Sequence, residues 1–341
     1  MSKSVLSLIS LALLTSSAWG VENGTPVDWA AQDNAVRLDN TSNAGVYCTA
    51  TLVAGRYALT AAHCLDEGLD TVVTASSHTI PFTQFDKHPN YVFTGGFSSE
   101  DVGIVTLDNA VDYSAIQFFN IDDRVEGESI SIAGFGGTIE TLNAVDLTFS
   151  HYSPNDNYRF VLYADVVVEA SHTTKGDSGS AWVNHANEIM AIHKGSNPYG
   201  GARETYGTDI QAVQDFLTEN IDAWHYPTLA KVNGRTTITV QSLHLSGITD
   251  TAYTDGNITL ISGDSTCVTE GLIAPFEQCT YVIEGNSGEE GHLYLSDSQV
   301  IHINKPEQNN APDSGSGASL GFLSLFGLAL FGRLRRKEGE I

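Results

Sequence analysis

Hydrophobic and polar residues alternate along most of the chain in short stretches that are separated by Gly, Asn and Asp. Residues 129–136 are a clear example, and residues 160–168 form another short apolar stretch. A period of two is typical of half-buried strands, so the region from residue 21 to about 222 predicts an all-β domain of many strands. Residues 209–221 differ, and their spacing predicts one closing helix. The apolar residues at helical spacing are Ile210, Val213, Phe216, Leu217 and Ile221.

A second β pattern covers residues 226–304, with expected strands at 236–240, 257–261, 279–283 and 292–295. Strands at this spacing predict a small β-sandwich domain, similar to an immunoglobulin domain, over 225–304. The sequence there contains no triad, metal-ligand spacing or phosphate loop. Binding, secretion and spacing all remain open as its role.

The first twenty residues are typical of a signal peptide. Lys3 gives a positive start, residues 5–14 are apolar, and Ala18 and Gly20 are small residues at a cleavage site. A membrane anchor is the alternative, but the apolar core is too short to span a bilayer. We therefore expect a secreted or cell-surface protein, exported through the periplasm of a Gram-negative bacterium.

The C-terminus has a polar linker at 305–317 and a hydrophobic segment with a basic tail at 318–341. Small residues, a short apolar span and basic residues at 333–337 resemble the bacterial sorting tail called GlyGly-CTERM. That resemblance implies type II secretion and a tail-processing protease, with membrane contact only through this segment. An uncleaved anchor is the alternative, although the span is short.

The amino-acid composition excludes one class of binding partner. The 341 residues include 41 Asp and Glu but only 16 Lys and Arg, which gives a net charge of −25. Nucleic acid is therefore excluded as a partner, since phosphate binding needs clustered basic residues. Four cysteines in an exported chain should form disulfides, and three pairings are possible.

Three blocks carry the candidate chemistry. Ser178 lies between Gly176-Asp177 and Gly179, a turn that presents a nucleophile with free backbone N–H groups beside it. His63 follows an apolar run, and Asp101 begins another alternating stretch. A surface turn is the plain alternative for the serine block alone.

The order His63, Asp101, Ser178, with the sequences around each, resembles the chymotrypsin-like serine proteases. The resemblance implies a double β-barrel with a closing helix over 21–224, a catalytic triad of these residues, and an oxyanion hole from the N–H groups of Gly176 and Ser178. It also implies a Cys48–Cys64 disulfide beside the histidine. Cys267–Cys279 would close a short loop in the later domain. No metal or cofactor is implied.

In that family, the acid before the serine pairs with the mature N-terminal ammonium. Residues 21–24 resemble the family's mature start, and Val21 directly follows the expected cleavage site. We therefore expect Val21 to pair with Asp177 after export. The alternative is that Asp177 is only a turn residue.

The substrate pocket departs from trypsin. His172 stands where trypsin-like enzymes have an Asp, which disfavours cleavage after Arg or Lys. Thr173 and His193 are similar to residues of the glutamyl endopeptidases, and Lys175 and Lys194 are nearby cations. This predicts cleavage after acidic residues, mainly Glu. His193 as an ordinary core histidine, with broader specificity for small or apolar residues, is the alternative.

These expectations favour a secreted serine endopeptidase that acts on proteins or peptides. The competing hypotheses are a non-catalytic relative used for binding or adhesion, and a protein whose main function lies in the β-sandwich.

Overall fold

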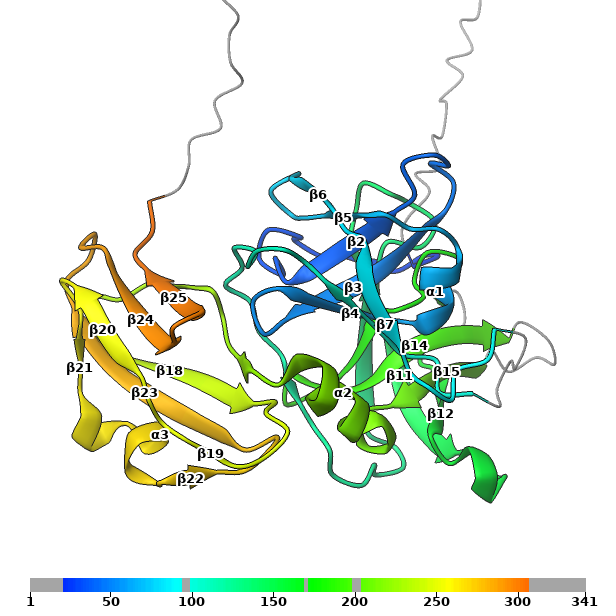
Figure 1. The fold of residues 1–341 in the computed structure, drawn as a ribbon. Helices are drawn as coiled ribbons and strands as arrows, with labels where there is room; N and C mark the ends of the chain where they lie inside the picture. The colour runs from blue at the N-terminus through cyan, green and yellow to red at the C-terminus, as the bar shows by residue number, and fades with distance from the viewer. Residues whose placement is uncertain (1–20, 94–98, 169–170, 198–203, 307–341) are drawn as a thin grey trace, which may run out of the picture. The chain divides into compact units, whose positions relative to one another are not determined.

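The computed structural model describes residues 21–93, 99–168, 171–197 and 204–306. The expected signal peptide and the expected hydrophobic tail lie outside the described residues, as does the expected linker beyond residue 306. Strands dominate the described part, with a few short helices, so the all-β prediction is confirmed (Figure 1). No helix in these residue ranges is long and apolar enough to cross a membrane.

The N-terminal sheet has seven antiparallel strands in the order β6-β5-β2-β3-β4-β8-β7. Its middle strand β3 is buried at every residue except Tyr47, because a large hydrophobic cluster packs around this strand. Helix α1, Ala62–Asp66, follows β4 directly and ends at Glu67. The strands are β2 Ala35–Asp39, β3 Tyr47–Val53, β4 Tyr57–Thr60, β5 Thr71–Val73, β6 Thr79–Pro81, β7 Gln84–Lys87 and β8 Gly103–Thr106.

The second sheet closes on itself. Strand β12 pairs with both β11 and β15, so β11, β10, β13, β14, β15 and β12 form a ring without a free edge. A closed ring of this kind is a β-barrel. Strand β1 pairs with β11 and β9 with β14. The strands are β1 Thr25–Pro26, β9 Phe118–Phe119, β10 Ser129–Gly134, β11 Asn143–Tyr152, β12 Val161–Val166, β13 Ala181–Asn184, β14 Glu188–Asn197 and β15 Glu204–Asp209, with the 3-10 turn η2 at Asp156–Tyr158.

The closing helix begins later than predicted. Asp209 is the last residue of β15, and a 3-10 turn, η3 Gln211–Val213, comes before α2, Gln214–Ile221. The Asp209 carboxylate pairs with the buried guanidinium of Arg124 and accepts a hydrogen bond from the Gln211 N–H. These contacts hold Asp209 in the strand, although the predicted apolar face of the helix is buried.

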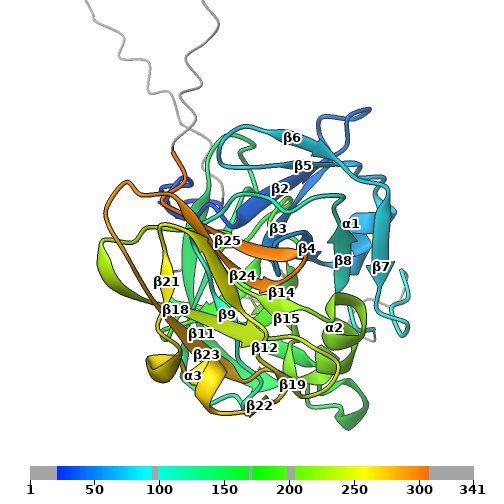
Figure 2. The same ribbon diagram turned by 60° about the vertical axis from the view of Figure 1, so that its left-hand side comes forward.

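Residues 224–303 form two further four-stranded sheets, β16-β18-β23-β21 and β17-β25-β24-β20, and a two-stranded pair, β19-β22 (Figure 2). One hydrophobic cluster contains side chains from both four-stranded sheets. The elements are β16 Trp224–His225, β17 Leu229–Ala230, β18 Gly234–Ser242, β19 Ile248–Thr249, β20 Tyr253–Gly256, β21 Thr259–Leu260, η4 Ser262–Asp264, α3 Thr266–Thr269, β22 Leu272–Ile273, β23 Gln278–Gly285, β24 Gly291–Ser296 and β25 Gln299–Ile303.

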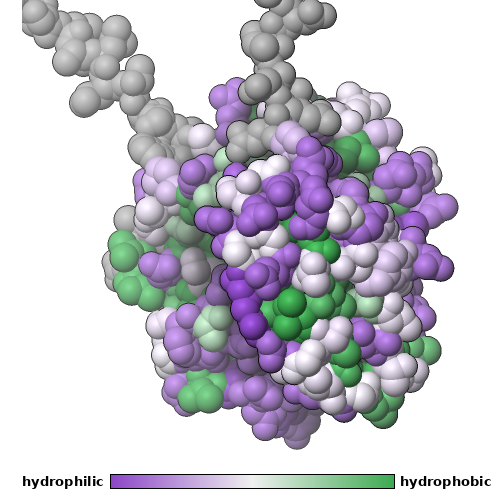
Figure 3. Space-filling view, turned by 90° about the vertical axis from the view of Figure 1, so that its left-hand side faces the viewer, coloured by the Kyte–Doolittle hydropathy of each residue, from purple (hydrophilic) through white to green (hydrophobic). Residues whose placement is uncertain are grey.

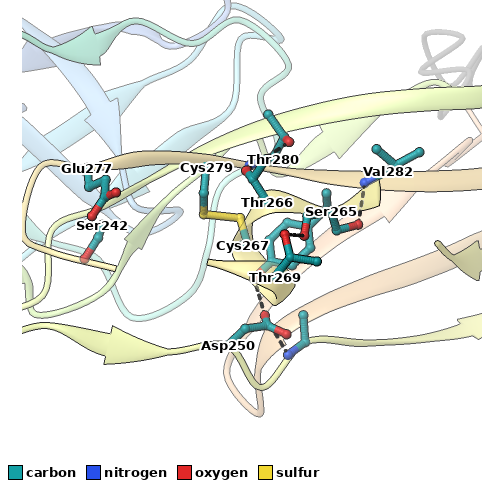
Figure 4. The surroundings of a disulfide bond; sticks show 12 residues. Ser242, Asp250, Ser265, Thr266, Cys267, Thr269, Glu277, Cys279, Thr280 and Val282 are labelled. Carbon is teal, nitrogen blue, oxygen red and sulfur yellow. Dashed lines mark hydrogen bonds between the residues drawn. A yellow bond between two sulfur atoms is a disulfide. The ribbon is translucent and has the colours of Figure 1, made fainter. Parts of the chain in front are cut away.

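Both expected disulfides are present in the structure. Cys48–Cys64 joins β3 to α1, and Cys267–Cys279 joins α3 to β23 (Figure 4). Hydrogen bonds support the second link, because the Thr280 N–H donates to Thr266 Oγ1, 2.8 Å away. The short helix α3 is thus held to its strand by a covalent bond and by side-chain contacts.

Polar contacts tie residues 224–303 to the segment that leads from the first sheet to the second. The buried Gln241 side chain accepts from the Phe119 N–H at 2.8 Å and donates to the Phe119 carbonyl at 2.8 Å. The buried His225 ring accepts from the Ala54 N–H through Nδ1, and its Nε2 contacts the Gln117 carbonyl. These bonds satisfy backbone groups that would otherwise be buried without partners.

Figure 3 shows one face on which hydrophilic residues surround small hydrophobic groups. Large hydrophobic side chains with high exposure, such as Leu272 and Phe93, come from separate parts of the chain.

Candidate active site

His63 and Asp101 meet beside the first sheet. One carboxylate oxygen of Asp101 accepts from the His63 backbone N–H at 2.9 Å, and the other lies 2.7 Å from the ring Nδ1. The same carboxylate therefore fixes both the backbone and the ring of the histidine. Asp101 is almost fully buried, whereas the His63 side chain is 23% exposed, so the ring remains accessible.

Local packing makes this pair possible. A Cβ atom on Gly103 would lie 2.6 Å from Leu65 Cδ1 and 3.3 Å from Ala62 Cα, so glycine lets α1 lie close to β8 without a shift of Leu65. On the other side, the Asp101 N–H donates to Thr208 Oγ1 of β15 at 3.2 Å. Nothing in the sequence pattern indicates this role for Thr208, because threonine is common in strands.

Effects of opposite direction act on the pKa of the His63 ring. Its burial disfavours the charged form, but the hydrogen bond and charge of Asp101 outweigh burial, and Glu67 adds to them. The pKa of His63 is therefore raised above its usual value, even though Lys194 acts in the opposite direction.

The Ser178 loop belongs to the second sheet but is held by the first. Thr49 on β3 donates its N–H to the Ser178 carbonyl at 2.9 Å and its hydroxyl to the Gly176 carbonyl at 2.8 Å. Gly179 has φ +85°, and a Cβ there would lie 2.1 Å from Thr60 Oγ1. The loop therefore needs glycine at this position, and the serine sits where the two sheets meet.

Two N–H groups of this loop have no acceptor within the described part of the chain. Asp177, Gly179 and Ser180 each donate to a backbone carbonyl. The hydrogen bonds of the described residues include none from the N–H of Gly176 or Ser178. Two free donors on either side of one residue are the arrangement that stabilises an oxyanion.

The residue that follows His63 lies close to the Ser178 loop. The sulfur of Cys64, the residue after His63, lies 3.7 Å from the Ser178 carbonyl oxygen. Within the described ranges, no hydrogen bond joins Ser178 Oγ to the His63 ring. Such bonds are often long before substrate binds and shorten in the complex.

Asp177 is fully buried beneath the loop. Its two carboxylate oxygens accept from the N–H groups of Gly136 and Thr174, each at 2.7 Å. Burial, only partly offset by these bonds, raises the pKa of Asp177 to about 7. In the part of the chain that the structure covers, no cation pairs with this carboxylate.

Val21 is also buried, within a hydrophobic cluster of the β-barrel that the second sheet forms. Its φ of +40° is a conformation that a β-branched residue rarely adopts. The next residue, Glu22, forms an isolated β-bridge with His172, close to the Ser178 loop in the sequence. The N-terminal segment thus enters this barrel with a strained backbone at Val21.

The three expected pocket residues differ in their surroundings. The His172 ring contacts the Glu22 carboxylate at 3.0 Å and so is engaged by the N-terminal segment. Thr173 is 2% exposed, and its hydroxyl has no hydrogen-bond partner among the described residues. A buried hydroxyl without a partner is unusual in folded proteins.

His193 lies on β14 with its ring stacked on Trp182, which donates to His193 Nδ1 at 3.4 Å. Burial, and to a smaller extent the charge of His63, lowers the pKa of His193 to about 3. The ring is therefore neutral at physiological pH, and it is close enough to His63 and Asp101 to interact with their charges.

One candidate metal cluster among the described residues does not fit a metal. Ligand atoms of Cys48, His63 and Cys64 lie within 4.8 Å of one another. The two sulfurs are bonded together, so neither is available as a thiolate.

Comparison with known proteins decides the family. The Trypsin family model matches residues 21–217. The chain belongs to the trypsin family. It is a serine endopeptidase, and its substrates are proteins or peptides.

Two solved structures are similar to the chain at low sequence identity, and the first of them shares its fold. Neuropsin, a serine protease of mouse brain, is 19% identical with a TM-score of 0.51, over 59% of this chain and 99% of neuropsin. The VesB protease of Vibrio cholerae is 18% identical with a TM-score of 0.49, over 83% of this chain and 98% of VesB. A search of curated proteins found no match.

The Thr49 contacts lead to a prediction. Thr49→Val removes the hydroxyl bond to the Gly176 carbonyl and leaves that buried group unpaired, which should lower the free energy of unfolding by about 1–3 kcal/mol. The labelling of Ser178 by a fluorophosphonate should also slow. Urea unfolding and labelling rates measure the two effects.

Thr51→Val is the matched control, because Thr51 is buried on the same strand and its hydroxyl has no hydrogen bond among the described residues. Equal stability and labelling in the two variants would contradict a special role for Thr49.

Proposed function

We propose that the enzyme cleaves peptide bonds by a Ser178-His63-Asp101 triad. The observation that supports this most strongly is the Asp101 carboxylate, which binds both the backbone N–H and the ring Nδ1 of His63. This contact leaves Nε2 as the proton acceptor. The His63 ring lies beside the serine loop, in which the N–H groups of Gly176 and Ser178 have no acceptor among the described residues.

In this mechanism, Ser178 Oγ attacks the scissile carbonyl and its proton passes to His63 Nε2. Asp101 stabilises the imidazolium, and the N–H groups of Gly176 and Ser178 bind the oxyanion. His63 then donates its proton to the leaving amine. Water repeats the sequence to release the acyl group from Ser178.

Ser178→Ala should abolish fluorophosphonate labelling and reduce kcat by about 10⁴-fold or more. Asp101→Asn should reduce kcat by about 10⁴-fold with the fold intact, because it changes the tautomer of His63. Ser180→Ala is the control, since Ser180 lies on the same loop outside the triad. Labelling that persists without Ser178 would refute the proposed nucleophile.

We propose further that export activates the enzyme by freeing the Val21 ammonium, which then pairs with Asp177. Three observations support this: the Asp177 carboxylate is buried without a cation among the described residues, Val21 is buried, and its φ is strained. Cleavage before Val21 would relieve the strain and give the carboxylate a charged partner.

The test compares, in an S178A background, a chain that starts at Val21 with one extended by a few residues. In the extended chain, the raised pKa of Asp177 means that the native state holds its proton more tightly than the unfolded state. The free energy of unfolding is therefore highest below about pH 4. It should fall by roughly 4 kcal/mol in all as the pH rises to about 7.

The Val21 chain should lack this fall, and Asp177→Asn should remove it from the extended chain. Thermal unfolding between pH 4 and 7 measures the effect. Identical pH profiles for the two chains would count against the activation proposal.

We propose that the residue before the scissile bond is acidic, mainly Glu. The Thr173 hydroxyl, which has no partner among the described residues, and the imidazole of His193 support this, because both can donate to a carboxylate. His193 would do so as a neutral ring, given its low pKa. His172 in place of an acid supports the exclusion of Arg and Lys.

A peptide library should show cleavage after Glu, and His193→Ala and Thr173→Val should each lower kcat/KM for Glu peptides by about tenfold, the value of one hydrogen bond to a charged group. His185→Ala, an exposed histidine, is the control. Cleavage mainly after small or apolar residues would favour the broader specificity, and cleavage after Arg would overturn the pocket.

We propose that the mature protease is extracellular, with residues 21–224 as the protease domain and 225–304 as an immunoglobulin-like accessory domain. The two disulfides support an oxidising compartment. Export through the periplasm and removal of a GlyGly-CTERM-like tail complete this proposal. The intact mass of protein from the culture medium tests both ends, and a tail still attached would exclude processing.

A further inference from the structure

Lys194 is a buried cation within the active site. It follows His193 on β14 and is only 8% exposed. Its ammonium donates to the Ser99 carbonyl at 2.6 Å, and Ser99 is itself buried two residues before Asp101. The lysine therefore ties the segment that carries Asp101 to the strand that carries His193.

Such a cation is costly to bury unless acids lie near it. Burial lowers the pKa of Lys194, while the charges of Asp101 and Glu100 act to raise it. Its own charge reaches His63, where it opposes the effects of Asp101 and Glu67.

The charged groups that face the His63 ring therefore carry charges of both signs. Asp101 and Glu67 favour the imidazolium, Lys194 disfavours it, and His193 is a neutral ring.

We propose that Lys194 is a positioning residue that holds the Asp101 segment and sets the charge balance of the His63–Asp101 pair. This inference rests on the proposed triad. A positive charge beside the pair makes the imidazolium less stable, so a larger fraction of His63 stays neutral and able to accept the Ser178 proton in mildly acidic solution.

The first test measures the His63 pKa by NMR of histidine-labelled full-length protein in an S178A background, with the signal assigned by H63N. S178A/K194M should raise this pKa by about half a pH unit or more, because one nearby positive charge is lost. S178A/K194R should keep the original value.

Lys175→Met is the matched control, since Lys175 lies on the serine loop but is exposed, and solvent screens its charge. No difference between K194M and the parent, or an equal shift with K175M, would overturn the proposal.

The second test uses the active protein. The acidic limb of the kcat/KM profile should move to higher pH in K194M but not in K194R, with roughly threefold lower activity below the limb for a shift of half a unit. A lower kcat with an unmoved limb would mean that Lys194 is only structural and would overturn the proposal.

If K194M does not accumulate as folded protein, K194Q serves in both tests, and the same results apply. The NMR shift does not depend on turnover. An inactive parent protein with the expected His63 shift would therefore refute the proposed function while supporting the role of Lys194.

Discussion

The contact between the Ser178 loop and strand β3 is the constraint on which the active site depends. The loop belongs to the second sheet and His63 to the helix that follows β4 of the first sheet, and Thr49 helps to join them by binding the carbonyls of Gly176 and Ser178. The N–H groups of Gly176 and Ser178, by contrast, have no acceptor among the described residues. The same close contact excludes any side chain at Gly179.

Buried charge is the second organising feature. Asp101, Asp177, His193 and Lys194 are all nearly inaccessible to water, and each is costly to bury alone. Asp101 is compensated by His63 and backbone contacts, and Lys194 by a carbonyl and two acids. His193 avoids the cost by remaining neutral. Asp177 is the exception, because its backbone donors only partly offset burial.

Local sequence patterns predicted many short strands and a Cys267–Cys279 link that closes a short loop, because each depends on residues close together in the chain. The Cys48–Cys64 pairing and the expected roles of His63, Asp101 and Ser178 came instead from the resemblance to a known family. The start of the last helix could not be predicted in this way. Asp209 stays in a strand because of Arg124, 85 residues away. Thr49 and Thr208 were missed for the same reason: a threonine in a strand gains its role only from the partner that tertiary structure brings to it.

The C-terminal sheets are linked to the same site through the segment that leads from the first sheet to the second. Gln241 and His225 bind the backbone at Phe119 and Gln117, and Phe119 belongs to β9, which pairs with β14. Strand β14 carries His193 and Lys194. A shift of the C-terminal sheets would therefore strain the strand that positions these residues. Residues 224–303 are thus joined to the protease by buried hydrogen bonds, and we expect any binding function they have to be compatible with these contacts.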